Sequence, residues 1–257
     1  MTLAVRDLKV RFGERIVAHI EALDLGDAEI VGLVGESGSG KSMTSLAIIG
    51  LARSLGATVE GSIVLDGVEL TELDEGQWRK LRGDRIAMIF QSPVSSLNPV
   101  FKVGDIFLRA LRLHGASKGE ARDRAHQAMR EVVLSPELLE RYPHQLSGGQ
   151  AQRVAIALAV ALRARVLLAD EPTSALDVTV QAEILALLQR MRREEGISIL
   201  FVSHDLAVVA GLCDRVAIMQ RGRIVEAGAT APTLRSPTDP YTQELVAAVP
   251  RIGAPRA

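Results

Sequence analysis

Cysteine is almost absent from this sequence, since Cys213 is the only one among 257 residues. A single thiol cannot form an internal disulfide, and it cannot supply the several sulfur ligands of a Cys-based zinc site or an iron–sulfur cluster. Such cysteine usage favours the reducing environment of the cytosol. Disulfide scaffolds, Cys-based zinc sites and iron–sulfur clusters built from this chain alone are therefore excluded.

The sequence also lacks an excess of charge of one sign and long apolar runs. The formal net charge is -1 at pH 7, so the chain has no overall basic excess, and we expect no nucleic-acid partner. Its longest apolar runs, such as residues 155–162, fall well short of the ~20 residues needed to cross a bilayer. The charged N-terminal stretch lacks the apolar core of a secretory signal. We therefore expect no export, and any membrane role to come through a partner protein.

What is present is the composition of an ordinary globular protein. Hydrophobic residues make up 47% of the chain and charged residues 24%, which is typical of a globular α/β protein and unlike a disordered or fibrous one. A chain of this length can bury a sizeable core. We expect one large domain, or a core domain with a smaller insertion.

Two kinds of strand pattern occur along the chain. Apolar and polar residues alternate over residues 3–12, and two short strand-like pieces within residues 62–70 flank Asp66 and Gly67, a dipeptide suited to a type I′ hairpin turn. These patterns predict an antiparallel β layer. A β-branched run that ends in glycines, EIVGLVG at residues 29–35, predicts a strand that leads into a glycine loop. Continuous apolar runs of strand length, as expected where both faces of a sheet are covered, occur at residues 85–90, 165–170 and 198–203.

Helical patterns separate the continuous strands, and residues 104–141 predict successive helices, one of them capped by Ser135 before Pro136. A hairpin about Arg221 and Gly222 and one amphipathic helix are expected near the end. The sequence thus predicts an α/β fold with a mostly parallel sheet, an N-terminal antiparallel β layer and an inserted helical subdomain. The expected boundaries are residues 1–90 and 155–235 for the core, 91–154 for the helical subdomain and 236–257 for a C-terminal tail.

Residues 35–42, GESGSGKS, match the phosphate-loop pattern of glycine, four residues, glycine, lysine and a hydroxyl residue, between an expected strand and an expected helix. Gly38 and Gly40 permit backbone conformations that aim several N–H groups into one concavity at a helix N-terminus, which favours anions. Lys41 then reaches the β- and γ-phosphates, and the Ser42 hydroxyl can ligate a magnesium ion. The alternative is a plain glycine turn. The predicted ligand is a nucleoside triphosphate with Mg²⁺, held by Gly35, Glu36, Ser37, Gly38, Ser39, Gly40, Lys41, Ser42 and Met43.

Adjacent carboxylates end the apolar run at residues 165–170. Asp170 and Glu171 leave a buried strand toward the edge at which an α/β sheet binds its ligands. We assign Asp170 to magnesium. Because successive strand side chains point opposite ways, Glu171 is the better candidate for polarising the attacking water. The alternative is a pair of surface acids at a strand end.

A second anion cradle is predicted at residues 146–150, LSGGQ, where a serine and two glycines open a helical run. As a bare pattern, this segment is equally an N-cap with a flexible lead-in. The candidate binding residues are Ser147, Gly148, Gly149 and Gln150.

With GESGSGKS, LSGGQ, LLADE and a histidine, His204, after the next strand, the chain strongly resembles the nucleotide-binding subunits of ABC transporters over nearly its whole length. This resemblance implies a P-loop NTPase fold and ATP hydrolysis. It implies a second ATPase subunit, the same or a related chain, whose LSGGQ closes on the γ-phosphate so that two ATP molecules lie between the pair. It also implies two transmembrane permease subunits, and a location at the cytoplasmic face of the inner membrane.

The resemblance suggests further single-residue roles, each beside a plainer alternative. It implies that Gln91 meets the magnesium ion and the water, where a capping amide is the alternative. It implies that His204 contacts the γ-phosphate, unless it is merely structural. The resemblance places Phe12 where the family stacks an aromatic ring on adenine, although the side chain would equally pack into the β layer. Residues 174–177, SALD, match the loop by which paired subunits touch, and Asp177 is also a candidate helix N-cap.

Two stretches narrow the resemblance to one branch. Residues 89–99, IFQSPVSSLNP, and 236–250, SPTDPYTQELVAAVP, are similar to the oligopeptide, dipeptide and nickel uptake branch, whose members are importers. Peptide importers of this type usually carry a longer, cysteine-bearing C-terminal extension, so the sequence leans toward a nickel-type subunit without excluding a peptide one. In such systems an extracytoplasmic binding protein and the permeases select the cargo.

Three alternatives remain at this point. A soluble ABC ATPase of DNA repair or translation would share the nucleotide site, but commonly has two fused cassettes or a coiled-coil insertion. A small-molecule kinase would have no reason to carry LSGGQ before LLADE. A regulatory module that binds ATP without turnover is disfavoured because Glu171 and His204 are both present.

Overall fold

The computed structural model describes residues 2–91, 97–174 and 176–248. The chain forms two compact units, each assembled from distant segments of the sequence. The first contains Met1–Leu3, Leu25–Glu29 and Glu72–Leu200, and the second contains Ala4–Asp24, Ile30–Thr71 and Phe201–Ala257.

An antiparallel layer forms one part of the second unit, as predicted. Its strands run in the order β2-β1-β4-β5, and the β4–β5 turn places Asp66 at φ 48° and Gly67 at φ 82°. Positive φ at both positions is the type I′ geometry that the dipeptide predicts. The strands are β1 (Leu3–Phe12), β2 (Arg15–Leu25), β4 (Thr58–Leu65) and β5 (Val68–Glu69).

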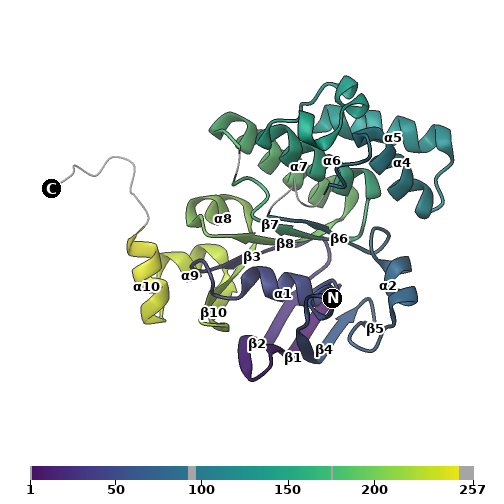
Figure 1. The fold of residues 1–257 in the computed structure, drawn as a ribbon. Helices are drawn as coiled ribbons and strands as arrows, with labels where there is room; N and C mark the ends of the chain where they lie inside the picture. Colours follow the sequence, from purple (N-terminus) through teal and green to yellow (C-terminus); the bar gives the residue numbers. More distant parts are fainter. Residues whose placement is uncertain (1, 92–96, 175, 249–257) are drawn as a thin grey trace. The chain divides into compact units, whose positions relative to one another are not determined.

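The same unit holds a second group of strands, drawn in Figure 1 with their helices. Strand β3 pairs in parallel with β9, and β10 pairs antiparallel with β9 across the predicted hairpin turn. All five residues of β3 are buried, as its continuous apolar pattern predicts. These elements are β3 (Ile30–Val34), α1 (Lys41–Ile48), the 3-10 turn η1 (Arg53–Leu55), α8 (Leu206–Leu212), β9 (Arg215–Gln220), β10 (Arg223–Ala229), α9 (Thr230–Arg235) and α10 (Pro240–Ala247).

Parallel strands form the sheet of the first unit. Strands β6 (Ile86–Ile89) and β7 (Val166–Asp170) pair in parallel, and β7 lies between β6 and β8 (Ser198–Ser203) in the strand order. Every residue of β7 is buried, so the α/β class and the mostly parallel sheet are confirmed. Helices α2 (Glu75–Leu81) and α7 (Val178–Glu195) belong to the same unit.

A group of helices lies between β6 and β7 along the chain, in the region where helices are predicted (Figure 1). Helices α4, α5 and α6 contact one another, and their contact faces bury Phe107 and Met129 among small residues. Ser135 caps the next element as predicted, but Pro136–Glu140 is a 3-10 helix rather than an α-helix. The elements are α4 (Val103–Leu113), α5 (Lys118–Glu131), η2 (Pro136–Glu140), η3 (Pro143–Gln145) and α6 (Gly148–Leu162).

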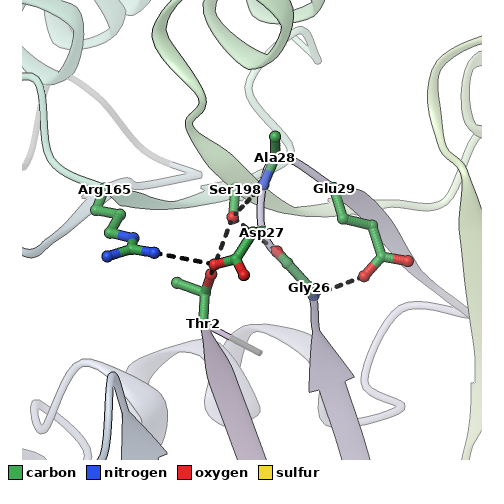
Figure 2. Close-up of polar contacts among 7 residues, drawn as sticks. All are labelled: Thr2, Gly26, Asp27, Ala28, Glu29, Arg165 and Ser198. Atoms are coloured by element: carbon green, nitrogen blue, oxygen red, sulfur yellow. Dashed lines mark hydrogen bonds and ion pairs between the residues drawn. The ribbon is translucent and has the colours of Figure 1, made fainter.

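A buried serine at the start of β8 anchors the loop between β2 and β3 (Figure 2). The Ser198 hydroxyl donates to the carbonyl of Gly26 at 2.7 Å and accepts the N–H of Ala28 at 3.0 Å. Ala28 has φ 50°, a left-handed conformation that costs free energy for a residue with a Cβ. At the loop surface, hydrogen bonds from Thr2 and then Arg165 lower the pKa of the Asp27 carboxyl. The loop is thus held in a strained conformation from both sides.

We expect Ser198→Ala to destabilise the protein by about 1–2 kcal/mol, because it removes the buried Ser198 hydroxyl from a partly buried N–H and a partly buried carbonyl. Urea unfolding followed by circular dichroism measures the change. A suitable control is Ser54→Ala, since the exposed Ser54 hydroxyl donates to one backbone carbonyl only and water can replace it, at a cost below about 0.5 kcal/mol. Equal effects of the two substitutions would contradict the anchoring role of Ser198.

Candidate functional site

The predicted phosphate loop connects β3 to α1 within the second unit. Gly38 and Gly40 have φ of 80° and 104°, values that L side chains rarely adopt. A Cβ on Gly40 would lie 2.6 Å from the carbonyl oxygen of Val17, whereas a Cβ on Gly38 would meet nothing within 4 Å. The backbone at Gly40 is therefore packed against the protein, and the space over Gly38 is open to a ligand.

Lys41 begins α1 and lies almost wholly inside the loop. The residue is only 5% exposed, and its ammonium group donates to the carbonyls of Gly35 at 2.7 Å and Glu36 at 2.8 Å. The loop therefore curls around its own lysine at a helix N-terminus, where N–H groups and a buried positive charge favour phosphate. Ser37 is exposed, Ser39 is buried, and Ser42 and Met43 are half-buried.

Phe12 and His204 belong to this unit as well. Phe12 is the last residue of β1 and is half-buried. His204 follows β8 directly and is exposed, while its neighbour Asp205 caps α8. Both residues thus stand at the end of a strand, as their motifs predict.

The first unit contains the adjacent carboxylates. Asp170 ends β7 and is 3% exposed. Glu171 leaves the strand with φ 47°, and its carboxylate accepts a hydrogen bond from the Gln91 amide at 3.2 Å. The structure therefore joins two of the predicted site residues, which are 80 positions apart in the chain. The sequence predicts both residues but not this contact.

Gln152 is a candidate positioning residue that sequence reasoning missed. It lies in α6 and is 0% exposed, and its amide donates to the backbone carbonyls of Pro172 at 2.8 Å and Glu171 at 3.4 Å. These bonds tie the helix after LSGGQ to the turn that carries Glu171. The available signal was an amide side chain at the start of a helical run that is apolar from Val154 onward.

The LSGGQ segment forms the start of α6. Ser147 is the N-cap, its hydroxyl accepts the N–H of Gln150 at 3.3 Å, and the Gln150 side chain accepts the N–H of Ser147 at 3.0 Å. Gly148 and Gly149 are the first helical residues, and a Cβ on Gly148 would meet nothing within 4 Å. The geometry is a capping box on an exposed helix N-terminus, which is compatible with an anion and with a plain cap.

The loop that the family places at the subunit contact is described in part. Asp177 caps α7 by accepting the N–H of Val180 at 3.0 Å, so the predicted N-cap is confirmed. Ala175 lies outside the described residues, as do Ser92–Ser96 of the IFQSPVSSLNP stretch and the last two residues of SPTDPYTQELVAAVP.

The predicted metal ligands fit magnesium by their chemistry. Ser42, Gln91 and Asp170 offer hydroxyl, amide and carboxylate oxygens, the hard ligands that Mg²⁺ takes together with water and substrate phosphates. Among the described residues, no group of three or more His, Cys, Asp and Glu side chains could hold a metal ion by itself.

No helix within the described ranges is long and apolar enough to span a membrane.

Known proteins resemble this chain over almost its full length. Glutathione import ATP-binding protein GsiA of Salmonella typhimurium (strain LT2) is 46% identical over 99% of this chain and 43% of its own length. GsiA of Escherichia coli (strain K12) is 44% identical over 98% of this chain and 42% of its own length. The chain therefore spans less than half the length of these relatives.

Solved structures agree with the fold. A dimeric ATP-binding cassette in a post-hydrolysis state bound to ADP and Pi superposes with a TM-score of 0.79 at 29% identity, covering 89% of this chain and 98% of that one. An ATP-binding subunit of an ABC transporter gives 0.78 at 28% identity, covering 91% and 92%.

The family profile described as ABC transporter matches residues 20–174, which include the phosphate loop, LSGGQ and LLADE. This match and the relatives together confirm the resemblance that the motifs predict. The chain belongs to the ABC transporter family, as one of its ATP-binding cassettes.

Proposed function

We propose that this chain binds ATP with Mg²⁺ and hydrolyses it as the ATPase subunit of an ABC importer. The observation that carries the proposal is the buried Lys41, held by its own loop beneath an open, positively polarised helix N-terminus. The 46% identity to an import ATP-binding protein supports the transport role.

The proposed division of roles follows the chemistry of each side chain. Lys41 and the loop N–H groups bind the phosphates, and Ser42, Gln91 and Asp170 hold magnesium, which supplies electrostatic stabilisation of the transferred phosphoryl group. Glu171 polarises the attacking water, and His204 contacts the γ-phosphate. Phe12 stacks on the adenine.

The LSGGQ segment is proposed to act on a second cassette. Its N-terminal N–H groups would close on the γ-phosphate held by the other subunit, giving an ATP-sandwich dimer, and hydrolysis would release the pair. The dimeric cassette among the solved structures supports this arrangement. The proposed domain boundaries remain residues 1–90 with 155–235, 91–154 and 236–257.

For the cargo, we propose small peptides. The relatives are named for glutathione import, and glutathione is a tripeptide, which favours the peptide side of the predicted branch over nickel. Two permease subunits and, indirectly, an extracytoplasmic binding protein would select the cargo, while this chain works at the cytoplasmic face of the membrane. None of the relatives named above is a DNA-repair or translation protein.

Affinity purification from membranes of the native host in mild detergent tests the proposal. We expect two multispanning permeases to co-purify, identified by mass spectrometry, with magnesium-dependent ATP hydrolysis in the same sample. The accompanying binding protein, tested with glutathione and with Ni²⁺, would separate the two cargo classes. Recovery of soluble partners alone, with hydrolysis intact, would overturn the transport assignment and keep the nucleotide site.

A further inference from the structure

A tyrosine from the C-terminal helix reaches the phosphate loop inside the second unit. The phenol oxygen of Tyr241, in α10, accepts the backbone N–H of Glu36 at 3.0 Å. Tyr241 is only 6% exposed, and burial raises the pKa of its phenol, which therefore stays neutral at physiological pH. The contact joins residues 205 positions apart, and no motif of the sequence indicates it.

The helix that carries Tyr241 is fixed to the sheet at its start. Glu226, in β10, accepts the N–H of Thr238 at 2.9 Å, its hydroxyl at 2.8 Å and the N–H of Asp239 at 3.2 Å. Asp239 in turn caps α10 by accepting the N–H of Tyr241 at 2.9 Å. Burial disfavours the charged form of Glu226, but these bonds outweigh it and lower its pKa to about 2. The ring of Tyr241 is thus placed by a built turn rather than by a loose tail.

On the loop side, Glu36 is the residue that links this tyrosine to Lys41. Its N–H is bound by Tyr241, while its carbonyl accepts both the Lys41 ammonium at 2.8 Å and the N–H of Ser39 at 3.2 Å. Glu36 therefore donates a hydrogen bond to Tyr241 of α10 through its N–H and accepts one from Lys41 through its carbonyl. Moving that segment would move an oxygen that fixes the position of the charge.

We propose that Tyr241 is a positioning residue for nucleotide binding. It holds the backbone of the phosphate loop at Glu36, so that Lys41 and the loop N–H groups are preorganised for phosphate. This inference rests on the proposed function, because it assumes that the loop binds ATP. It gives the segment Pro237–Tyr241 a role in the nucleotide site of its own chain. Loss of preorganisation weakens binding without changing the reacting groups.

Tyr241→Phe in the full chain tests the inference, because it removes the hydroxyl and keeps the ring. We expect the Kd for Mg-ATP, measured by isothermal titration calorimetry, and the KM for ATP to rise about three- to tenfold, while kcat stays within about twofold. Hydrogen exchange of the Glu36 amide should accelerate, because its acceptor is gone. A role in packing alone would leave the Kd and the KM unchanged.

A matched control lies on the same helix. Glu244 is exposed and lies in α10 outside the segment Pro237–Tyr241, so Glu244→Gln should bind Mg-ATP like the parent. Glu226→Gln keeps Tyr241 intact but weakens the turn beneath it, and we expect a Kd between those of the parent and Tyr241→Phe. If Tyr241→Phe fails to fold, Glu226→Gln decides the question alone, since an unchanged Kd there would overturn the proposal.

The outcomes separate this inference from the proposed function. A parent protein that binds no Mg-ATP overturns both. A parent that binds Mg-ATP, with Tyr241→Phe binding equally well and folding normally, overturns the positioning role only. A rise in Kd for Tyr241→Phe but not for Glu244→Gln supports it.

Discussion

Glu171→Gln is expected to retain ATP binding, accumulate a stable ATP-bound pair and lose hydrolysis by on the order of 100-fold. The substitution removes the charge that would polarise water but keeps an oxygen that can accept the Gln91 hydrogen bond, now 3.2 Å long. Binding and chemistry are therefore separated in one variant. Phosphate release and size-exclusion chromatography with Mg-ATP measure the two effects.

The control for this variant is Glu183→Gln, an exposed carboxylate on α7 of the same unit, which should hydrolyse ATP at the parent rate. Turnover of Glu171→Gln close to that of the parent would remove Glu171 from the role proposed for it. The Glu171 carboxylate would then serve only as the acceptor of the Gln91 hydrogen bond.

Lys41→Met should weaken Mg-ATP binding by about 100-fold, and hydrolysis at ordinary ATP concentrations should fall with it. A charge-assisted hydrogen bond contributes about 1.5–3 kcal/mol, which is roughly 10- to 100-fold in affinity, and this ammonium is expected to contact two phosphates. The apolar side chain of methionine fills much of the same buried space, so packing is largely kept. Titration with a fluorescent ATP analogue measures the loss.

Lys118→Met is the matched control, because Lys118 is the exposed first residue of α5 and should bind the analogue like the parent. Lys41 also donates hydrogen bonds to the carbonyls of Gly35 and Glu36, so its replacement also destabilises the phosphate loop itself. Thermal unfolding in the absence of nucleotide measures this loss of stability separately from the loss of affinity. Nearly unchanged affinity in Lys41→Met, with the control normal, would contradict the phosphate-binding role.

Features that depend on short stretches of sequence were predictable. The spacing of glycines and lysine places a loop between β3 and α1, and Asp66 with Gly67 predicts the β4–β5 hairpin, because both turns need a positive φ that glycine adopts at little cost, so the residues at the turn itself reveal it. Ser147 and Asp177 were recognisable as helix caps for the same reason, since a cap acts within three residues.

Elements whose stability depends on distant neighbours were missed. Strand β2 lies at the edge of its sheet, and its consecutive exposed residues Glu21 and Ala22 interrupt the alternation of buried and exposed positions. Helix α9 contains Pro232 near its start, a position at which proline is allowed but which weakens the helical pattern. The contacts of Gln152 and Tyr241 join segments far apart in the chain, so no local pattern encodes them.

The distance along the chain between paired strands affects how this protein folds during its synthesis. Strand β3 is buried on both faces, yet its parallel partner β9 follows it by roughly 180 residues, which a ribosome needs about 10 to 40 s to add. Its other neighbour in the strand order, β8, emerges only shortly before β9, so a fully apolar strand beside the phosphate loop stays unpaired through most of synthesis, and non-local parallel pairing is slow to form. The nascent chain is therefore exposed to aggregation late in translation, and its nucleotide loop can take its final form only when β9 and α10 have emerged.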